Sequence, residues 1–175
     1  LGIPWLRHLR SYRLDEIDEM YAELSKQLNT DLTEAAAEFR KKAEEKITES
    51  LAVIGDYPVA VDYQAVLRPF NLALALTEYG FKVGLVASNG IPAFEKESAK
   101  KLKEMVPDIV FTDPMHPQSV QYPHEGEEYL CIGFDCGYIT KSKKLVELVE
   151  DEGLFGYSGV MELMNRMQDA FLTKA

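Results

Sequence analysis

The stretch "YPVAVDYQAVLRPFNLALALTEYGFKVGLVAS", residues 57–88, sets the architecture expected for this chain. It opens with a short apolar, β-branched run at 57–63, continues into a helical segment and ends in a second apolar run at 81–88. Pro69 lies in the first turn of the helical segment and Gly80 just past its end, where these residue types are favoured. A strand, a helix and a strand in this order predict two parallel strands joined by a right-handed crossover.

The same alternation continues toward the C-terminus. The further expected elements are two strands and three helices, at 108–113, 128–134, 92–106, Ser142 to about Glu152, and from near Ser158 onward. Because the strands are almost continuous apolar runs, both faces of their sheet should be covered. The sequence therefore predicts an α/β fold with a doubly wound, parallel, four-stranded Rossmann-like sheet over residues 57–175.

A helical segment precedes that domain. Apolar residues recur at helical spacing over 14–28 and 33–54, and the second helix is long and rich in Glu and Lys on its other face. We expect residues 1–56 to be the end of a preceding domain plus a linker helix. Since the chain opens without Met on the apolar run from Leu1 to Leu6, we also expect it to belong to a longer protein.

Composition excludes several classes of partner. A net charge of -10 over 175 residues argues against nucleic-acid binding and against anionic membrane surfaces. The N-terminus lacks the apolar core of a signal peptide, and two cysteines do not make a disulfide scaffold, so a cytoplasmic location is expected. The first strand-to-helix turn holds no glycine and no phosphate-binding loop is present, which argues against NAD and ATP as ligands.

Ligands of open α/β sheets bind outside the carboxyl ends of the strands. The residues at those ends are the candidate site: His116, Asp113 and Asp135 as catalytic groups, and Asp62, Tyr63, Ser88, Asn89 and Tyr138 as cofactor-binding groups. His116 could donate protons near neutral pH or could simply face water.

The two cysteines differ in their expected roles. Cys131 falls in the middle of a strand and should be a small buried apolar residue. Cys136 follows the strand and is the candidate ligand of a soft metal, the alternative being an ordinary loop cysteine. In an extended chain the two would lie roughly 16 Å apart, at about 3.3 Å per residue, too far to share one zinc ion. His124 is expected in water.

Five segments in order resemble one family. They are "LGIPW", "EFRKKAEEKITESLAVI", "NLALALTEYGFKVGLVASN", "LKEMVPDIVFTD" and "GLFGYSGVMELMNRMQDAF". The set resembles the C-terminal portion of nitrogenase component 1-type oxidoreductases, which include nitrogenase subunits, cofactor-assembly scaffolds, and dark-type protochlorophyllide and chlorin reductases. Gly156, Tyr157 and Gly159 are the positions that carry over cleanly, and their expected role is structural, at a helix start close to the sheet.

The resemblance implies a partner system. Such proteins have three Rossmann-like domains around an iron-sulfur or related metallocluster, or a tetrapyrrole. They pair with a homologous component 1 subunit and receive electrons from an ATP-dependent iron-sulfur reductase, so this chain alone should be inactive. The nitrogenase cofactor is held by a histidine in the last domain, but residues 131–156 contain none here, which argues against dinitrogen reduction.

A second reading comes from a different functional class. An α/β lobe joined to a long helix would also suit a binding module that captures a corrinoid or another metal chelate without redox activity. A purely structural role would be favoured if the chain's own side chains close the carboxyl ends of the strands.

Overall fold

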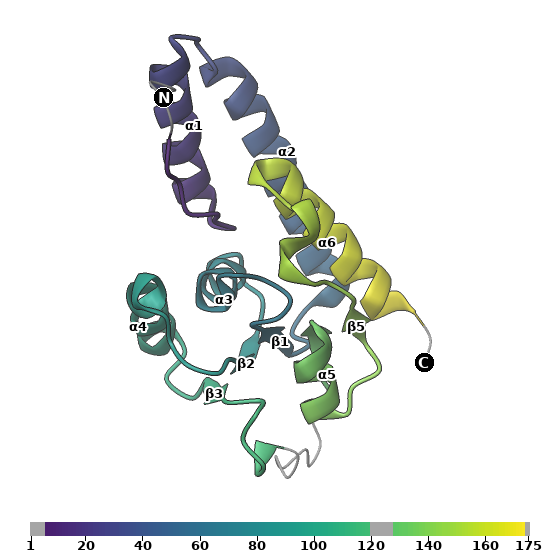
Figure 1. The fold of residues 1–175 in the computed structure, drawn as a ribbon. Helices are drawn as coiled ribbons and strands as arrows, with labels where there is room; N and C mark the ends of the chain where they lie inside the picture. Colours follow the sequence, from purple (N-terminus) through teal and green to yellow (C-terminus); the bar gives the residue numbers. More distant parts are fainter. Residues whose placement is uncertain (1–5, 120–127, 174–175) are drawn as a thin grey trace.

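The computed structural model describes residues 6–119 and 128–173. Its centre is a parallel five-stranded sheet in the order β3-β2-β1-β4-β5 (Figure 1). The strands are β1 Val59–Asp62, β2 Val83–Ala87, β3 Val110–Thr112, β4 Leu130–Ile132 and β5 Leu145–Val146. All four pairings are parallel, as the crossover pattern of the sequence predicts.

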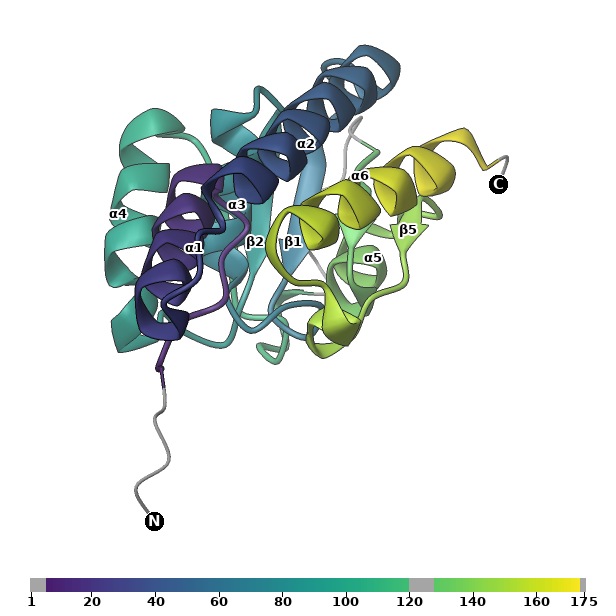
Figure 2. The same cartoon turned by 90° about the horizontal axis from the view of Figure 1, so that it is seen from above.

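The helices cover both faces of the sheet. They are α1 Leu14–Leu28, α2 Thr33–Ile54, α3 Pro69–Glu78, α4 Lys96–Met105, α5 Phe134–Thr140 and α6 Gly156–Leu172, with short 3-10 helices η1 Ala93–Glu95 and η3 Glu150–Gly153. Val61 and Ile132 belong to a core shared with α3 and α6, while Ala60 and Cys131 face α5 on the other side. Helix α4 packs beside α3, and α2 packs along α6 (Figure 2). The sheet is thus doubly wound, as predicted.

The segment after β4 differs from the prediction. The helix expected from Ser142 to about Glu152 is wrong, because Leu145 and Val146 instead pair with Cys131 and Ile132 as the fifth strand. The alternation of Lys, Leu, Val and Glu in this segment satisfies a helical pattern as well as a strand. Strand β4 is also shorter than expected, and α5 begins at Phe134, so Asp135 to Tyr138 lie in a helix and not in an exit loop.

The N-terminal helices are joined to the sheet unit by buried polar contacts. The Ser11 hydroxyl and the Tyr12 amide both donate to Asn71 Oδ1 of α3, at 3.0 and 3.2 Å. The Tyr12 hydroxyl donates to Asp151 at 2.6 Å, and Ile17 is buried in the same core as the strands. The division into residues 1–56 and 57–175 stays a prediction. No helix within residues 6–119 or 128–173 has the length and apolar character needed to cross a membrane.

Candidate functional site at the carboxyl edge of the sheet

The switch point of the sheet lies between β1 and β4, whose following helices α3 and α5 pack on opposite faces. Asp62 ends β1 at this point, and its side chain is fully buried. Its carboxylate accepts hydrogen bonds from the backbone amides of Gln64 at 2.8 Å and Cys136 at 3.1 Å. Asp62 therefore caps the first turn of α5, and burial raises the pKa of its carboxyl group above the ordinary value.

Gly133 completes the closure of the switch point. Its φ of 104° lies in the region that favours glycine. A Cβ atom at this position would lie 2.5 Å from the Cβ of Asp62 and 2.8 Å from the Cβ of Ala65. The crevice in which open α/β sheets commonly hold ligands is therefore filled at its deepest point by this chain's own atoms.

The two cysteines lie together beneath this point. Both are fully buried, as predicted for Cys131. The chain turns back at Gly133 instead of running on as a strand, so the expected separation of roughly 16 Å in extended chain does not hold. Both cysteines contact the Thr140 hydroxyl, through Cys131 Sγ at 3.1 Å and the Cys136 carbonyl oxygen at 2.7 Å. The Cys136 thiol also contacts the carbonyl oxygen of Gly133 at 3.3 Å, and burial raises its pKa. Its thiol does not open onto the edge of the sheet, so its role as a metal ligand stays a prediction that this position does not favour.

Asp113 and His116 share one exposed turn after β3. The Met115 amide donates to Asp113 Oδ1 at 2.9 Å, and the Gln118 amide donates to His116 Nδ1 at 3.2 Å. Since Nδ1 accepts a hydrogen bond, the neutral imidazole carries its proton on Nε2. These two side chains, with Ser119, line a polar pocket of ≈ 230 Å³.

The third catalytic candidate lies elsewhere. Asp135 occupies the first turn of α5, where partial burial raises the pKa of its carboxyl group. Strands β2 and β1 stand between β3 and β4, so three strand spacings of about 4.8 Å put it roughly 14 Å from His116. The structure joins His116 with Asp113 but not with Asp135.

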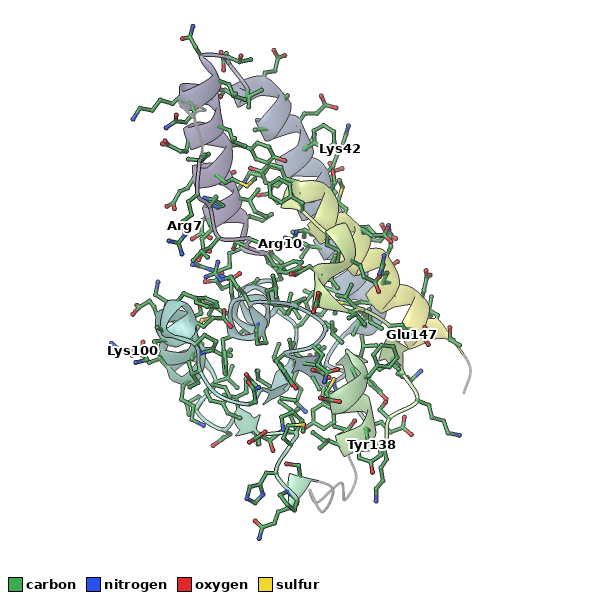
Figure 3. All side chains as sticks on the ribbon, viewed as in Figure 1. Arg7, Arg10, Lys42, Lys100, Tyr138 and Glu147 are labelled. Atoms are coloured by element: carbon green, nitrogen blue, oxygen red, sulfur yellow. The ribbon has the colours of Figure 1, made fainter. Side chains whose placement is uncertain are left out.

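The cofactor-binding candidates are spread along the same edge. Ser88 follows β2, and its hydroxyl donates to the carbonyl of Gly90 at 2.7 Å, while Asn89 is exposed beside it. Tyr63 follows β1 and is half-buried. Tyr138 lies on α5 with its side chain 74% exposed, and it points away from the body of the protein (Figure 3).

An apolar rim is the feature that the residue-by-residue sequence reading missed. Exposed large apolar side chains follow every strand of the sheet, and we call this set the apolar rim: Leu67, Ile91, Phe94, Met115, Phe134 and Val149. Single exposed apolar residues are ordinary, and these six are distinguished by their recurrence after all five strands, which makes the edge a candidate contact surface. The signal available in the sequence was an apolar residue within each loop after a strand.

Whether the edge suits a metallocluster depends on the side chains there that could act as metal ligands. Within residues 6–119 and 128–173, no group of three or more His, Cys, Asp or Glu side chains could hold a metal ion. His8 is exposed ahead of α1, and His124 lies outside the described residues. The described residues therefore do not form a ligand set for a cluster.

Comparison with known proteins shows a likeness of fold to solved structures. No family model matches the chain, and neither does any curated protein. A solved structure described as "Nitrogenase Cp1 at pH 6.5" superposes with a TM-score of 0.69 over 95% of this chain, at 14% sequence identity. The fold is nitrogenase-like. The chain spans 40% of the length of that solved chain, and at this identity the likeness concerns the fold alone.

The nitrogenase-like motif at the start of α6 has a packing role. Gly156 has a φ of 58°, and a Cβ on it would lie 2.6 Å from the hydroxyl oxygen of Tyr21. A Cβ on Gly159 would lie 2.8 Å from the carbonyl carbon of Leu154. Both glycines therefore have a packing role, but the close approach is to Tyr21 of α1 and to Leu154 just ahead of α6, and not to the sheet as expected.

Proposed function

We propose that this chain is the C-terminal lobe of a nitrogenase component 1-like oxidoreductase, and that its carboxyl edge forms one wall of a metallocluster or tetrapyrrole cavity. The likeness of fold over 95% of the chain supports this assignment. The single observation that carries the cavity is the apolar rim, because six large apolar side chains around one edge need a covering surface. A homologous subunit and other domains would complete the cavity.

The residues of this lobe have two tasks in the proposal. The apolar rim contacts the cofactor or substrate and excludes water from it. Asp135 and His116 donate protons as electrons arrive from an ATP-dependent iron-sulfur reductase. Asp135 suits this task because burial raises the pKa of its carboxyl group toward the working pH. Ligands for any metal would come from outside the described residues, and the lobe alone would be inactive.

Iron content and intact mass of the anaerobically purified native protein test the redox proposal. We expect a mass well above 19.8 kDa together with bound iron. A native mass of 19.8 kDa without iron would refute it.

The rim itself can be tested separately with protoporphyrin IX as a probe, by titration and fluorescence. Replacing Phe134 or Met115 with Ala should weaken binding at least about fivefold, since each removes exposed apolar area. Val53→Ala is the matched control, because Val53 is exposed on α2 before β1, at the opposite edge of the sheet. Equal binding by all three variants would contradict a role for the rim.

A binding module for a corrinoid or metal chelate without redox activity is the second candidate. The observation that favours it is the lack of a metal ligand set within residues 6–119 and 128–173, since a chelate brings its own metal ligands. Cobalamin titration of the iron-free native protein separates the two: tight binding without iron supports the module, and iron in the native protein supports the oxidoreductase.

A further inference from the structure

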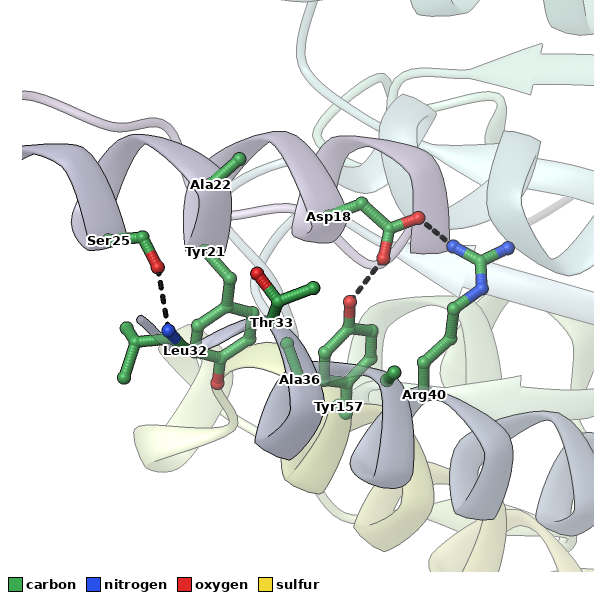
Figure 4. Close-up of a pocket in the computed structure, with 10 residues that line it drawn as sticks. Asp18, Tyr21, Ala22, Ser25, Leu32, Thr33, Ala36, Arg40 and Tyr157 are labelled. Atoms are coloured by element: carbon green, nitrogen blue, oxygen red, sulfur yellow. Dashed lines mark hydrogen bonds and ion pairs between the residues drawn. The ribbon is translucent and has the colours of Figure 1, made fainter. Parts of the chain in front are cut away.

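A second cavity lies between α1, α2 and the first turn of α6 (Figure 4). Its volume is ≈ 230 Å³, and a neighbouring cavity of ≈ 170 Å³ shares Tyr21, Leu32, Ala36 and Tyr157 with it. A single aromatic ring fits a cavity of about 150 Å³. The space is therefore large enough for a small organic molecule.

Local sequence explains why this space is open. Helix α2 presents small side chains from Ala36 and Ala37, which cannot fill the gap to α1. The rings of Tyr21 and Tyr157 stack with their centroids 5.2 Å apart and form an aromatic wall. Gly156 permits this stack, because any side chain there would collide with Tyr21. The wall is thus formed by two helices, α1 and α6, and α2 contributes the small side chains opposite it.

One end of the cavity holds a charged cluster with two carboxylates and one cation: Asp18 and Arg40 line the cavity, and Glu44 lies outside the lining. The Asp18 carboxylate accepts hydrogen bonds from the Tyr157 hydroxyl and from Arg40 (Figure 4). Arg40 also donates through Nε to Glu44 at 3.0 Å. One guanidinium therefore serves two carboxylates, and Arg40 is the one cationic side chain among the described residues that line the cavity. A cation placed beside Asp18 and the tyrosine rings would be favoured both by charge and by cation–π attraction.

We propose that this cavity binds a small organic amine. The apolar body of the amine lies between Ala36 and the stacked rings, and its ammonium group donates hydrogen bonds to Asp18. The ligand contacts α1, α2 and α6 at once, so its binding stabilises the packing of helices α1 and α2 against α6. This site is independent of the carboxyl edge and of the function proposed for it.

The test compares three probes that differ in their polar group: benzylamine, benzyl alcohol and benzoate. Binding is followed by amide shifts in two-dimensional NMR spectra of the chain. We expect benzylamine to bind about tenfold more tightly than benzyl alcohol, benzoate to bind weakest, and the shifts to centre on Tyr21 and Tyr157. Asp18→Asn should abolish the preference for the amine over the alcohol.

Two substitutions on α2 locate the site. Ala36→Leu fills the cavity and should remove benzylamine binding, whereas Ala52→Leu, on the exposed side of the same helix, should leave it unchanged. If Ala36→Leu fails to fold, Asp18→Asn still tests the proposal, because this variant should bind benzylamine no more tightly than benzyl alcohol. The proposal is overturned if benzylamine does not bind, if benzoate binds as tightly, or if neither Asp18→Asn nor Ala36→Leu changes the binding.

Discussion

Gly133→Ala should destabilise the protein strongly, because the switch point of the sheet has no room for a methyl group. Two effects add. At φ 104° and ψ 164° Gly133 lies in a region that is essentially restricted to glycine, and an L-residue there costs about 1–3 kcal/mol in backbone strain. The new Cβ would also lie 2.5 Å from Asp62 Cβ and 2.8 Å from Ala65 Cβ, and overpacking of this kind costs about 1–3 kcal/mol. We therefore expect a loss of about 2–6 kcal/mol in the free energy of unfolding.

Urea unfolding at 25 °C, followed by circular dichroism, measures this loss. Gly153→Ala is the matched control, since Gly153 has a φ of 80° but a Cβ there would meet nothing within 4 Å. It should show the strain alone, about 1–2 kcal/mol. Adding Ala65→Gly to Gly133→Ala should recover part of the difference. If Gly133→Ala is no worse than Gly153→Ala, the switch point is not filled as described.

Three further predictions concern buried polar groups and thiols. Glu95→Gln should cost about 1–3 kcal/mol, because the fully buried carboxylate accepts two backbone amides of α3 and a glutamine leaves one of them without an acceptor. The exposed control Glu97→Gln should change stability by less than about 0.5 kcal/mol in the same urea assay. The pKa of Asp62 is raised in the folded state, so its carboxyl group binds a proton more readily in the folded protein than in the unfolded chain. This group should therefore stabilise the fold increasingly as pH falls toward the ordinary Asp pKa of 3.8. Urea titrations at several pH values measure this gain, and Asp62→Asn should lack the contribution of Asp62 to it. Cys131 and Cys136 should react with a disulfide reagent only on unfolding, and rapid labelling of the native protein would show that the buried placement is wrong.

Several features of this protein follow from local sequence. The strand, helix and strand of residues 57–88 are readable because apolar runs, Pro69 and Gly80 act within a few residues of each other. The parallel, doubly wound fold follows from repeating that unit, and the nitrogenase-like comparison agrees with it. Burial of Cys131 was predictable for the same reason, since it lies inside an apolar strand.

Other features were decided by tertiary structure. Strand β5 has only two residues, too few to show a period, and it exists because β4 offers a free edge. The Cys136 amide donates to the Asp62 carboxylate because the chain turns at Gly133, and no sequence pattern predicts the φ of that turn. The cavity beside Tyr21 depends on Tyr157, which reaches α1 from the far end of the chain. Local periodicity records which face of an element is apolar, but which distant element covers that face is set by the packing of the whole chain.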